Sequence, residues 1–190
     1  KFWIFNNIIS NIDTKNLTIH ILNTAGIFTY PDKQYNMVRA GIGIWGLLPD
    51  LAPSATEVKT MEFKPVMGLK GRITRIHTMK KDEGISYGYS FIAPKDTKVA
   101  TIPIGYADGI PRALSNKIYG KINGTKIKQI GNITMDQMMF DITDIDAKEG
   151  DVITLLGEDL LIDEWAKILN TINYELTCRL KVRLPRVYIR

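Results

Sequence analysis

IYGKINGTKIKQI (residues 118–130) is the segment of this sequence whose local structure is easiest to predict. The dipeptide Asn123-Gly124 lies between two runs, 118–122 and 125–130, that are rich in isoleucine. Asn-Gly is the preferred pair for a two-residue β-hairpin turn, because both residues accept the positive φ angles that such a turn requires. We therefore predict an antiparallel hairpin over 118–130.

Short β-like segments flank this hairpin on both sides, at a spacing of roughly 8 to 12 residues. They are 66–79, 84–91, 99–104, 135–142, 152–156, 174–182 and 187–189. One helix interrupts the series, with Asp163 as its N-cap and with Trp165, Ile168 and Leu169 on one face. This pattern predicts a mainly antiparallel β domain over residues 51–190.

The first 50 residues alternate between element types at a shorter interval. We predict a helix over 1–12, a buried strand over 17–22, a loop over 23–26, a turn over 30–33 and a second apolar strand within 37–45. Strand, loop, helix or turn, and strand within about 25 residues is typical of βα units, whose ligand sites lie on the loops after the strands. A Pro-containing linker at 49–54 would separate this part from the β domain.

Composition excludes several classes of protein. The chain has 190 residues, of which 45% are hydrophobic and 24% charged, so it is too apolar for intrinsic disorder. No apolar run approaches the roughly 20 residues of a membrane span. One cysteine and two widely separated histidines argue against a disulfide framework and a metal centre, and fit a reducing cytosol. The net charge of +5 comes from interleaved charges, which favours a solvated surface over a nucleic-acid interface.

A few polar residues stand in apolar surroundings. Arg39 lies in MVRAGI (37–42) and needs a partner, because an unpaired buried charge is expensive; a structural ion pair would be sufficient. His20 and Tyr87, taken alone, are more simply explained as core side chains. Asp136 interrupts a further apolar stretch. The residues by themselves leave a structural and a functional role open for each of the four.

Seven short segments have the sequences and the order found in one enzyme family, and the chain resembles the C-terminal half of alanine racemase. The segments are NTA (23–25), MVRAGI (37–42), SYG (86–88), TIPIGYADG (101–109), MDQ (135–137), INYE (172–175) and RLPR (183–186). TIPIGYADG and MDQ at this separation, with SYG ahead of them, make a coincidence improbable.

The resemblance implies the last βα units of a (β/α)8 TIM-type barrel over residues 1–50, followed by the β domain over 51–190. It also implies pyridoxal 5'-phosphate (PLP) as cofactor and a cytoplasmic homodimer with shared active sites, a small amino-acid substrate, and neither nucleic acid nor membrane as a partner. The reaction would interconvert L-alanine and D-alanine for peptidoglycan synthesis by transfer of the α-proton between two bases. One base would be a Schiff-base lysine that this chain lacks. Because the chain also begins at Lys1 inside an apolar pattern, we expect an incomplete polypeptide that is inactive alone.

The resemblance assigns roles position by position. Tyr87 would be the second base, acting across the dimer interface. Arg39, supported by His20, would face the pyridine nitrogen of PLP, and its phosphate would be held by Thr24, Gly41, Ile42 and Tyr174. The substrate would meet the N–H of Met135, beside Asp136, and Tyr106 would line the entrance. Thr24 and Leu184 depart from the family's commoner Ser and Val, conservatively in both cases. No metal is implied.

Three alternatives remain open at this point. A related barrel-plus-β-domain decarboxylase would place an acid at the pyridine nitrogen, which Arg39 argues against. A racemase for serine or another small amino acid would share most of these motifs. The third alternative is not an enzyme but a non-catalytic PLP-binding or interaction fragment. The joint presence of Tyr87, Arg39, Tyr174 and Met135 argues against it.

Overall fold

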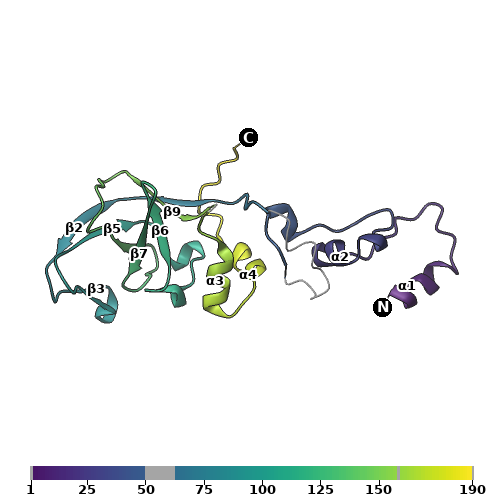
Figure 1. Ribbon diagram of the computed structural model, residues 1–190, viewed down its shortest axis with the longest axis horizontal. Coiled ribbons are helices and arrows are strands. Elements are labelled where there is room, and N and C mark those ends of the chain that lie inside the picture. Colours follow the sequence, from purple (N-terminus) through teal and green to yellow (C-terminus); the bar gives the residue numbers. More distant parts are fainter. Residues whose placement is uncertain (1, 50–62, 158, 190) are drawn as a thin grey trace. The chain divides into compact units, whose positions relative to one another are not determined.

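The computed structural model describes residues 2–49, 63–157 and 159–189, which belong to two units, Lys1–Lys64 and Pro65–Arg190 (Figure 1). The expected domain boundary at residue 50 and the greater part of the linker 49–54 lie outside the described residues. None of the helices in the described ranges has the length and hydropathy needed to cross a membrane.

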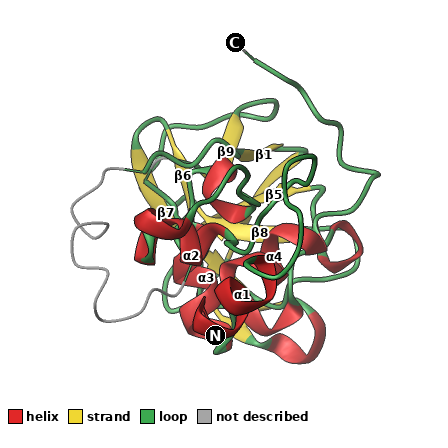
Figure 2. Ribbon diagram, turned by 90° about the vertical axis from the view of Figure 1, so that its right-hand side faces the viewer, coloured by secondary structure: helices red, strands yellow, loops and turns green. Residues whose placement is uncertain are grey.

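A seven-stranded sheet is the main structure of the unit Pro65–Arg190 (yellow in Figure 2). Its strands are β1 (Leu69–Arg72), β2 (Arg75–Met79), β5 (Thr97–Ile102), β6 (Tyr119–Ile122), β7 (Thr125–Ile130), β8 (Met138–Asp141) and β9 (Val152–Leu156). They are ordered β1-β9-β6-β7-β8-β5-β2, and each neighbouring pair is antiparallel. The short strands β3 (Gly84–Ile85) and β4 (Phe91–Ile92) pair with each other. The prediction of a mainly antiparallel β domain is confirmed.

The predicted hairpin over 118–130 is confirmed as the pair β6 and β7. Asn123 has φ 48° and Gly124 φ 81°, the positive values that a tight hairpin turn requires. Ile127 is buried between the exposed Lys126 and Lys128, so β7 has one face toward the core and one toward solvent.

Fully buried aliphatic and aromatic side chains from neighbouring strands form the core beneath the sheet. Ile102 on β5, Ile130 on β7, Phe140 on β8 and Leu155 on β9 are each at most 1% exposed. Burying a side chain of this size is worth about 1.5–3 kcal/mol. The sheet is therefore a firm base for the loops at its edges, and these loops carry Tyr87, Tyr106, Met135 and Asp136.

The C-terminal strands predicted at 174–182 and 187–189 are not present. The first is the helix α4 (Asn173–Arg179), and residues 187–189 run as exposed loop toward the C-terminus (Figure 2). The segment has strand-like composition, but its buried side chains, Asn173 and Leu176, are three residues apart and share one helix face, and α4 packs against the preceding helix. An i,i+4 ion pair between Glu175 and Arg179 stabilises the same conformation.

That preceding helix is α3 (Ile162–Leu169), which confirms the one helix predicted within the β domain. Asp163 is not its N-cap, which is Leu161, but lies in the first turn and accepts a hydrogen bond from the side chain of Asn173. Trp165 is buried as predicted, whereas Ile168 is 38% exposed. Asp163 thus links α3 to α4 instead of starting α3.

The unit Lys1–Lys64 contains the helices α1 (Phe2–Ile9) and α2 (Thr24–Thr29) and the 3-10 turns η1 (Pro31–Lys33) and η2 (Ile42–Trp45). The helix predicted over 1–12 is present in this shorter form. The loop predicted over 23–26 is wrong, because Asn23 caps α2 by accepting a hydrogen bond from the N–H of Gly26.

The strands predicted at 17–22 and within 37–45 are not assigned as strands in the structure. Their backbone pairing consists of one parallel bridge between Asn23 and Arg39, together with a hydrogen bond from the N–H of Arg39 to the carbonyl of Leu22. A parallel ladder needs several evenly spaced hydrogen bonds in succession. The two segments are therefore adjacent but do not form a sheet.

Candidate functional site

The expected site residues fall into two groups, one in each unit. His20, Thr24, Arg39, Gly41 and Ile42 belong to Lys1–Lys64, whereas Tyr87, Tyr106, Met135, Asp136 and Tyr174 belong to Pro65–Arg190. Within its own unit, each group can be examined for what its atoms contact.

Arg39 is fixed by contacts to the segment that precedes α2. Its Nη1 donates to Nδ1 of His20, and its Nη2 donates to the carbonyl of Ile21 at 3.3 Å. A guanidinium has no acceptor, so Nδ1 of His20 must be unprotonated to receive this bond. The structure therefore brings His20 and Arg39 together and leaves Arg39 as a group that can donate hydrogen bonds but cannot take up a proton.

Thr24 and Gly41 form a second contact in the same unit. The N–H of Gly41 donates to Oγ1 of Thr24 at 2.7 Å, and the side chain of Thr24 is buried at the start of α2. Because a hydroxyl accepts and donates at once, Oγ1 keeps its own proton for a further acceptor. A Cβ at Gly43 would lie 2.9 Å from Cγ2 of Thr24, so this close approach depends on glycine. Ile42 follows directly, as the first residue of η2.

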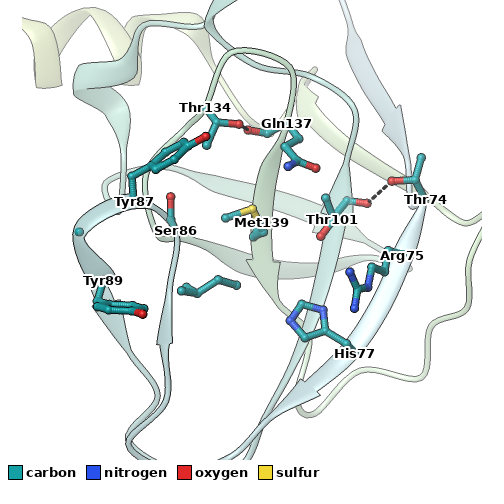
Figure 3. A pocket seen from close by; sticks show the side chains of 12 residues that line it. Thr74, Arg75, His77, Ser86, Tyr87, Tyr89, Thr101, Thr134, Gln137 and Met139 are labelled. Carbon is teal, nitrogen blue, oxygen red and sulfur yellow. Dashed lines mark hydrogen bonds between the residues drawn. The ribbon is translucent and has the colours of Figure 1, made fainter.

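A cavity of about 800 Å³ lies beside Tyr87 in the other unit (Figure 3). Tyr87 opens the 3-10 turn η4 (Tyr87–Tyr89), and its side chain is 78% exposed, which corrects the simple explanation as a core aromatic. Its backbone is anchored: Nδ2 of Asn132 donates to the carbonyl of Tyr87 at 2.7 Å, and Oγ of Ser86 donates to the carbonyl of Asn132 at 3.1 Å. A fixed main chain thus presents a free phenol at the edge of the cavity.

Ser86 has an unusual backbone conformation for a residue with a side chain. Its φ is 69°, in the region that favours glycine, and such a conformation costs about 1–3 kcal/mol. Strained residues of this kind cluster at functional sites, where the surrounding structure maintains them. The strain at Ser86 is an independent structural reason to regard the position of Tyr87 as functional.

Sequence analysis did not identify the opposite side of the cavity, which Arg75 and His77 of β2 line (Figure 3). Nδ1 of His77 is buried and has no hydrogen-bond partner among the described residues. Burial, and secondly the nearby charge of Arg75, lower the pKa of His77 against the smaller opposing effect of Glu83. His77 is therefore neutral at neutral pH. Within the described ranges, no cluster of three potential metal ligands occurs.

Tyr106 and Met135 are brought together by backbone pairing. Tyr106 starts the 3-10 turn η5 (Tyr106–Asp108), and its N–H donates to the carbonyl of Thr134, while the N–H of Ala107 donates to the carbonyl of Met135 at 3.0 Å. A Cβ at Gly105 would lie only 2.3 Å from the carbonyl oxygen of Thr134, so this approach requires glycine. The side chains of Tyr106 and Met135 are both about half exposed, at 42% and 53%.

Asp108 and Arg183 form an ion pair that the sequence analysis missed, in which the side chain of Asp108 is buried and that of Arg183 is about half exposed. Nε and Nη2 of Arg183 donate to the two carboxylate oxygens of Asp108 at 2.6 and 3.1 Å, and the N–H of Gly105 donates to Oδ2 of Asp108 at 2.8 Å. The sequence analysis gives Asp108 no role of its own; its place in an otherwise apolar TIPIGYADG segment is the signal that could have marked it. Nη2 of Arg183 also donates to Asp136.

We expect the substitution Asp108→Asn to destabilise the protein by about 2 kcal/mol at pH 7 and by much less at pH 3. Burial raises the pKa of Asp108, but the Arg183 guanidinium and the Gly105 N–H together outweigh it, so the net pKa lies below its usual range. The ionised carboxylate therefore contributes stability that is full above about pH 5 and is lost as the pH falls below about 4. Urea unfolding at the two pH values measures the difference.

Asp144→Asn is the control for this measurement, because Asp144 is 85% exposed and contacts Lys95 at 3.8 Å. Its unfolding midpoint should match the wild type at both pH values. A gap between Asp108→Asn and wild type that is equally large at pH 3 and pH 7 would contradict the assignment.

Tyr174 is the second residue of α4, in the unit Pro65–Arg190, and Thr24 is the first residue of α2, in the other unit. The structure describes each of them within its own unit, so their joint role stays a prediction. The same holds for Tyr87 and Arg39.

Family models match nearly the whole chain. The family model described as "Alanine racemase, N-terminal domain" matches residues 1–49, and the model described as "Alanine racemase, C-terminal domain" matches residues 66–188. The alanine racemase of Nostoc sp. strain PCC 7120 is 43% identical over 94% of this chain and 47% of its own length. Alanine racemase 2 of Bacillus subtilis strain 168 is 37% identical, over 91% of this chain and 45% of its own length.

Solved structures agree with these sequence matches. The alanine racemase of Clostridium difficile 630 superposes with a TM-score of 0.86 at 36% identity, covering 99% of this chain and 48% of that one. The alanine racemase of Bartonella henselae, whose structure is titled as having covalently bound pyridoxal phosphate, has a TM-score of 0.80 at 30% identity and covers 97% and 50%. The chain thus spans about half the length of the proteins it matches.

Proposed function

Because the chain belongs to the alanine racemase family, with part of the barrel domain followed by the C-terminal β domain, we propose that the full-length protein interconverts L-alanine and D-alanine. The observation that carries the proposal is the identity of 37–43% over at least nine-tenths of the chain to proteins named alanine racemase. We further propose that the protein is a cytoplasmic homodimer with shared active sites and supplies D-alanine for peptidoglycan.

The contacts in the unit Lys1–Lys64 fit PLP as the cofactor. Thr24 keeps a hydroxyl proton for an anion, because its Oγ1 accepts the N–H of Gly41 in this structure, and the N–H of Ile42 follows at the start of η2. Hydroxyl and amide donors of this kind suit a phosphate dianion. We assign phosphate binding to Thr24, Gly41, Ile42 and the hydroxyl of Tyr174.

Arg39 would face the pyridine nitrogen. When bound, PLP supplies a conjugated ring that stabilises the charge left at Cα after the α-proton is removed. Arg39 stays protonated and can only donate, so it discourages protonation of the ring nitrogen, and His20 holds its guanidinium in place. A PLP ring whose nitrogen is not protonated withdraws electrons less strongly. This limits side reactions such as transamination, which suits racemisation and not decarboxylation.

Tyr87 would hold and move a proton at its phenol oxygen. Racemisation needs proton transfer at both faces of the substrate Cα, and two positioned bases can supply the opposite faces. The exposed phenol of Tyr87, on an anchored main chain, is free to reach a substrate bound by another subunit. The N–H of Met135 would bind the substrate carboxylate beside Asp136, and Tyr106, which is tied to the same turn, would line the entrance.

The test is an assay of the full-length protein. We expect absorbance from bound PLP and conversion of L-alanine to D-alanine that is faster than conversion of L-serine, measured by chiral chromatography. Purified protein without PLP absorbance after incubation with the cofactor, or turnover confined to serine or to a bulky amino acid, would overturn the proposal.

A further inference from the structure

Arg183 connects two carboxylates that are far apart in the sequence. Asp108 precedes it by 75 residues and Asp136 by 47 residues. Nε donates to Oδ1 of Asp108, and Nη2 donates both to Oδ2 of Asp108 at 3.1 Å and to Oδ1 of Asp136 at 2.6 Å. Three of the five N–H groups of the guanidinium thereby donate to carboxylates, and these hydrogen bonds, first to Asp108 and then to Asp136, hold the pKa of Arg183 above its ordinary value.

One end of this contact is rigid. The side chain of Asp108 is 5% exposed and also accepts the N–H of Gly105, while the carbonyl of Asp108 accepts the N–H of Lys181 at 2.9 Å. A Cβ at Gly109 would lie 2.1 Å from the carbonyl oxygen of Arg179, so the chain before Arg183 passes directly against the turn η5. Arg183 is therefore anchored through Asp108.

The other end is the tip of an exposed turn. Thr134 closes the turn by donating from its N–H and its hydroxyl to the carbonyl of Gln137, which leaves Met135 and Asp136 projecting. Met135 is 53% exposed and the side chain of Asp136 is 62% exposed. Among the described side chains, the ion pair to Arg183 is the interaction recorded for the carboxylate of Asp136.

We propose that Arg183 is a positioning residue for the substrate entrance: by holding Asp108 and Asp136 at once, it sets the place of Met135 relative to Tyr106. This rests on the proposed function, because it is there that Met135 and Tyr106 meet the substrate. An exposed ion pair adds little to stability, so the second carboxylate is better explained by what it orients. A planar guanidinium holds two carboxylates with donors in a rigid fork, whereas an ammonium is a point charge with rotatable donors and fixes their geometry less.

The first experiment measures amide hydrogen exchange in the full-length protein and its Asp136→Asn variant. Asp136→Asn leaves the pair between Arg183 and Asp108 intact, so the fold should be retained. We expect the amides of Tyr106 and Ala107, which donate to Thr134 and Met135, to exchange about fivefold faster. The amide of Gly105, which donates to Asp108, should not change.

Asp96→Asn is the matched control, because Asp96 is a half-exposed carboxylate paired with Lys80 at 2.7 Å. It should leave the exchange of Tyr106 and Ala107 as in wild type. Unchanged exchange of these two amides in Asp136→Asn, or equal acceleration by Asp96→Asn, would overturn the proposal. This outcome does not depend on catalysis: a protein that racemises no alanine contradicts the proposed function, while exchange still decides the role of Arg183.

The second experiment is a double-mutant cycle on alanine racemisation. Asp136→Asn should raise KM for alanine about fivefold and change kcat less than twofold, because it displaces a binding group and leaves the proton-transferring groups in place. Arg183→Gln should raise KM at least as much, and Arg183→Lys less. Adding Asp136→Asn to Arg183→Gln should have no further effect, whereas additive increases in KM would show that Arg183 does not act through Asp136.

Discussion

Racemisation of alanine by the full-length protein is expected to fall about 10²- to 10⁴-fold when Tyr87 is replaced by phenylalanine, because a positioned acid–base group is typically worth that much. The phenol of Tyr87 lies on η4 in the β domain, whereas the residues assigned to the cofactor include Thr24 and Arg39 of the other unit. Cofactor absorbance should therefore persist in Tyr87→Phe. Exchange of the α-proton of L-alanine with solvent deuterium, followed by NMR, measures the loss.

Tyr119→Phe is the control for this substitution, because Tyr119 on β6 is 41% exposed and its ring contacts the ammonium of Lys126. It should racemise alanine at the wild-type rate.

A mixed-dimer experiment tests whether Tyr87 acts across a dimer interface. Mixing inactive Tyr87→Phe protein with inactive protein lacking the cofactor-binding lysine should restore activity, because one site of the mixed dimer would keep both groups. Subunit exchange without recovered activity would contradict that assignment.

Reversing the charge at Arg39 is the second substitution expected to change the reaction strongly. Arg39→Glu should lower racemisation about 10²-fold and increase the formation of pyruvate by transamination, because a glutamate carboxylate can accept a hydrogen bond from a protonated ring nitrogen and an arginine cannot. The substitution also removes the donor to Nδ1 of His20. Coupled assays for D-alanine and pyruvate measure both changes in one preparation.

Arg39→Lys is the matched variant, because it keeps a protonated donor and loses only the planar guanidinium. It should form less pyruvate than Arg39→Glu even if its racemisation is also lowered. An Arg39→Glu protein with an unchanged racemisation rate and no pyruvate would show that Arg39 does not face the cofactor ring.

Local signals predicted those elements whose conformation depends on neighbouring residues. The Asn123-Gly124 turn, with isoleucines on both sides, is enough to define β6 and β7, and 152–156 is recovered as β9. The same kind of signal failed at 174–182, where β-like composition lies in a helix. Packing of Leu176 and a side-chain bond from Asn173 to Asp163 decide that conformation, and both depend on a neighbouring helix.

The candidate site divides in the same way. The sequences of short motifs identified Arg39, Tyr87 and Met135, since each lies in a segment that resembles the family. Their roles toward cofactor and substrate are still predictions. It did not identify Arg183 as the partner of Asp108. RLPR, TIPIGYADG and MDQ are separate motifs in the sequence, and nothing in their spacing shows that one guanidinium joins all three.

By itself, the sequence determined the class of the fold, the family and the hairpin at 118–130, because turn chemistry and motif wording are properties of contiguous residues. Only the tertiary structure decided that Tyr87 is exposed on an anchored backbone, that Ser86 is strained and that Arg183 bridges two carboxylates. Exposure and ion pairing depend on which distant segments the sheet brings together. Asp108 and Asp136 lie within reach of one guanidinium because η5, which follows β5, pairs with the turn after Ile133, an adjacency that no local pattern in the chain specifies.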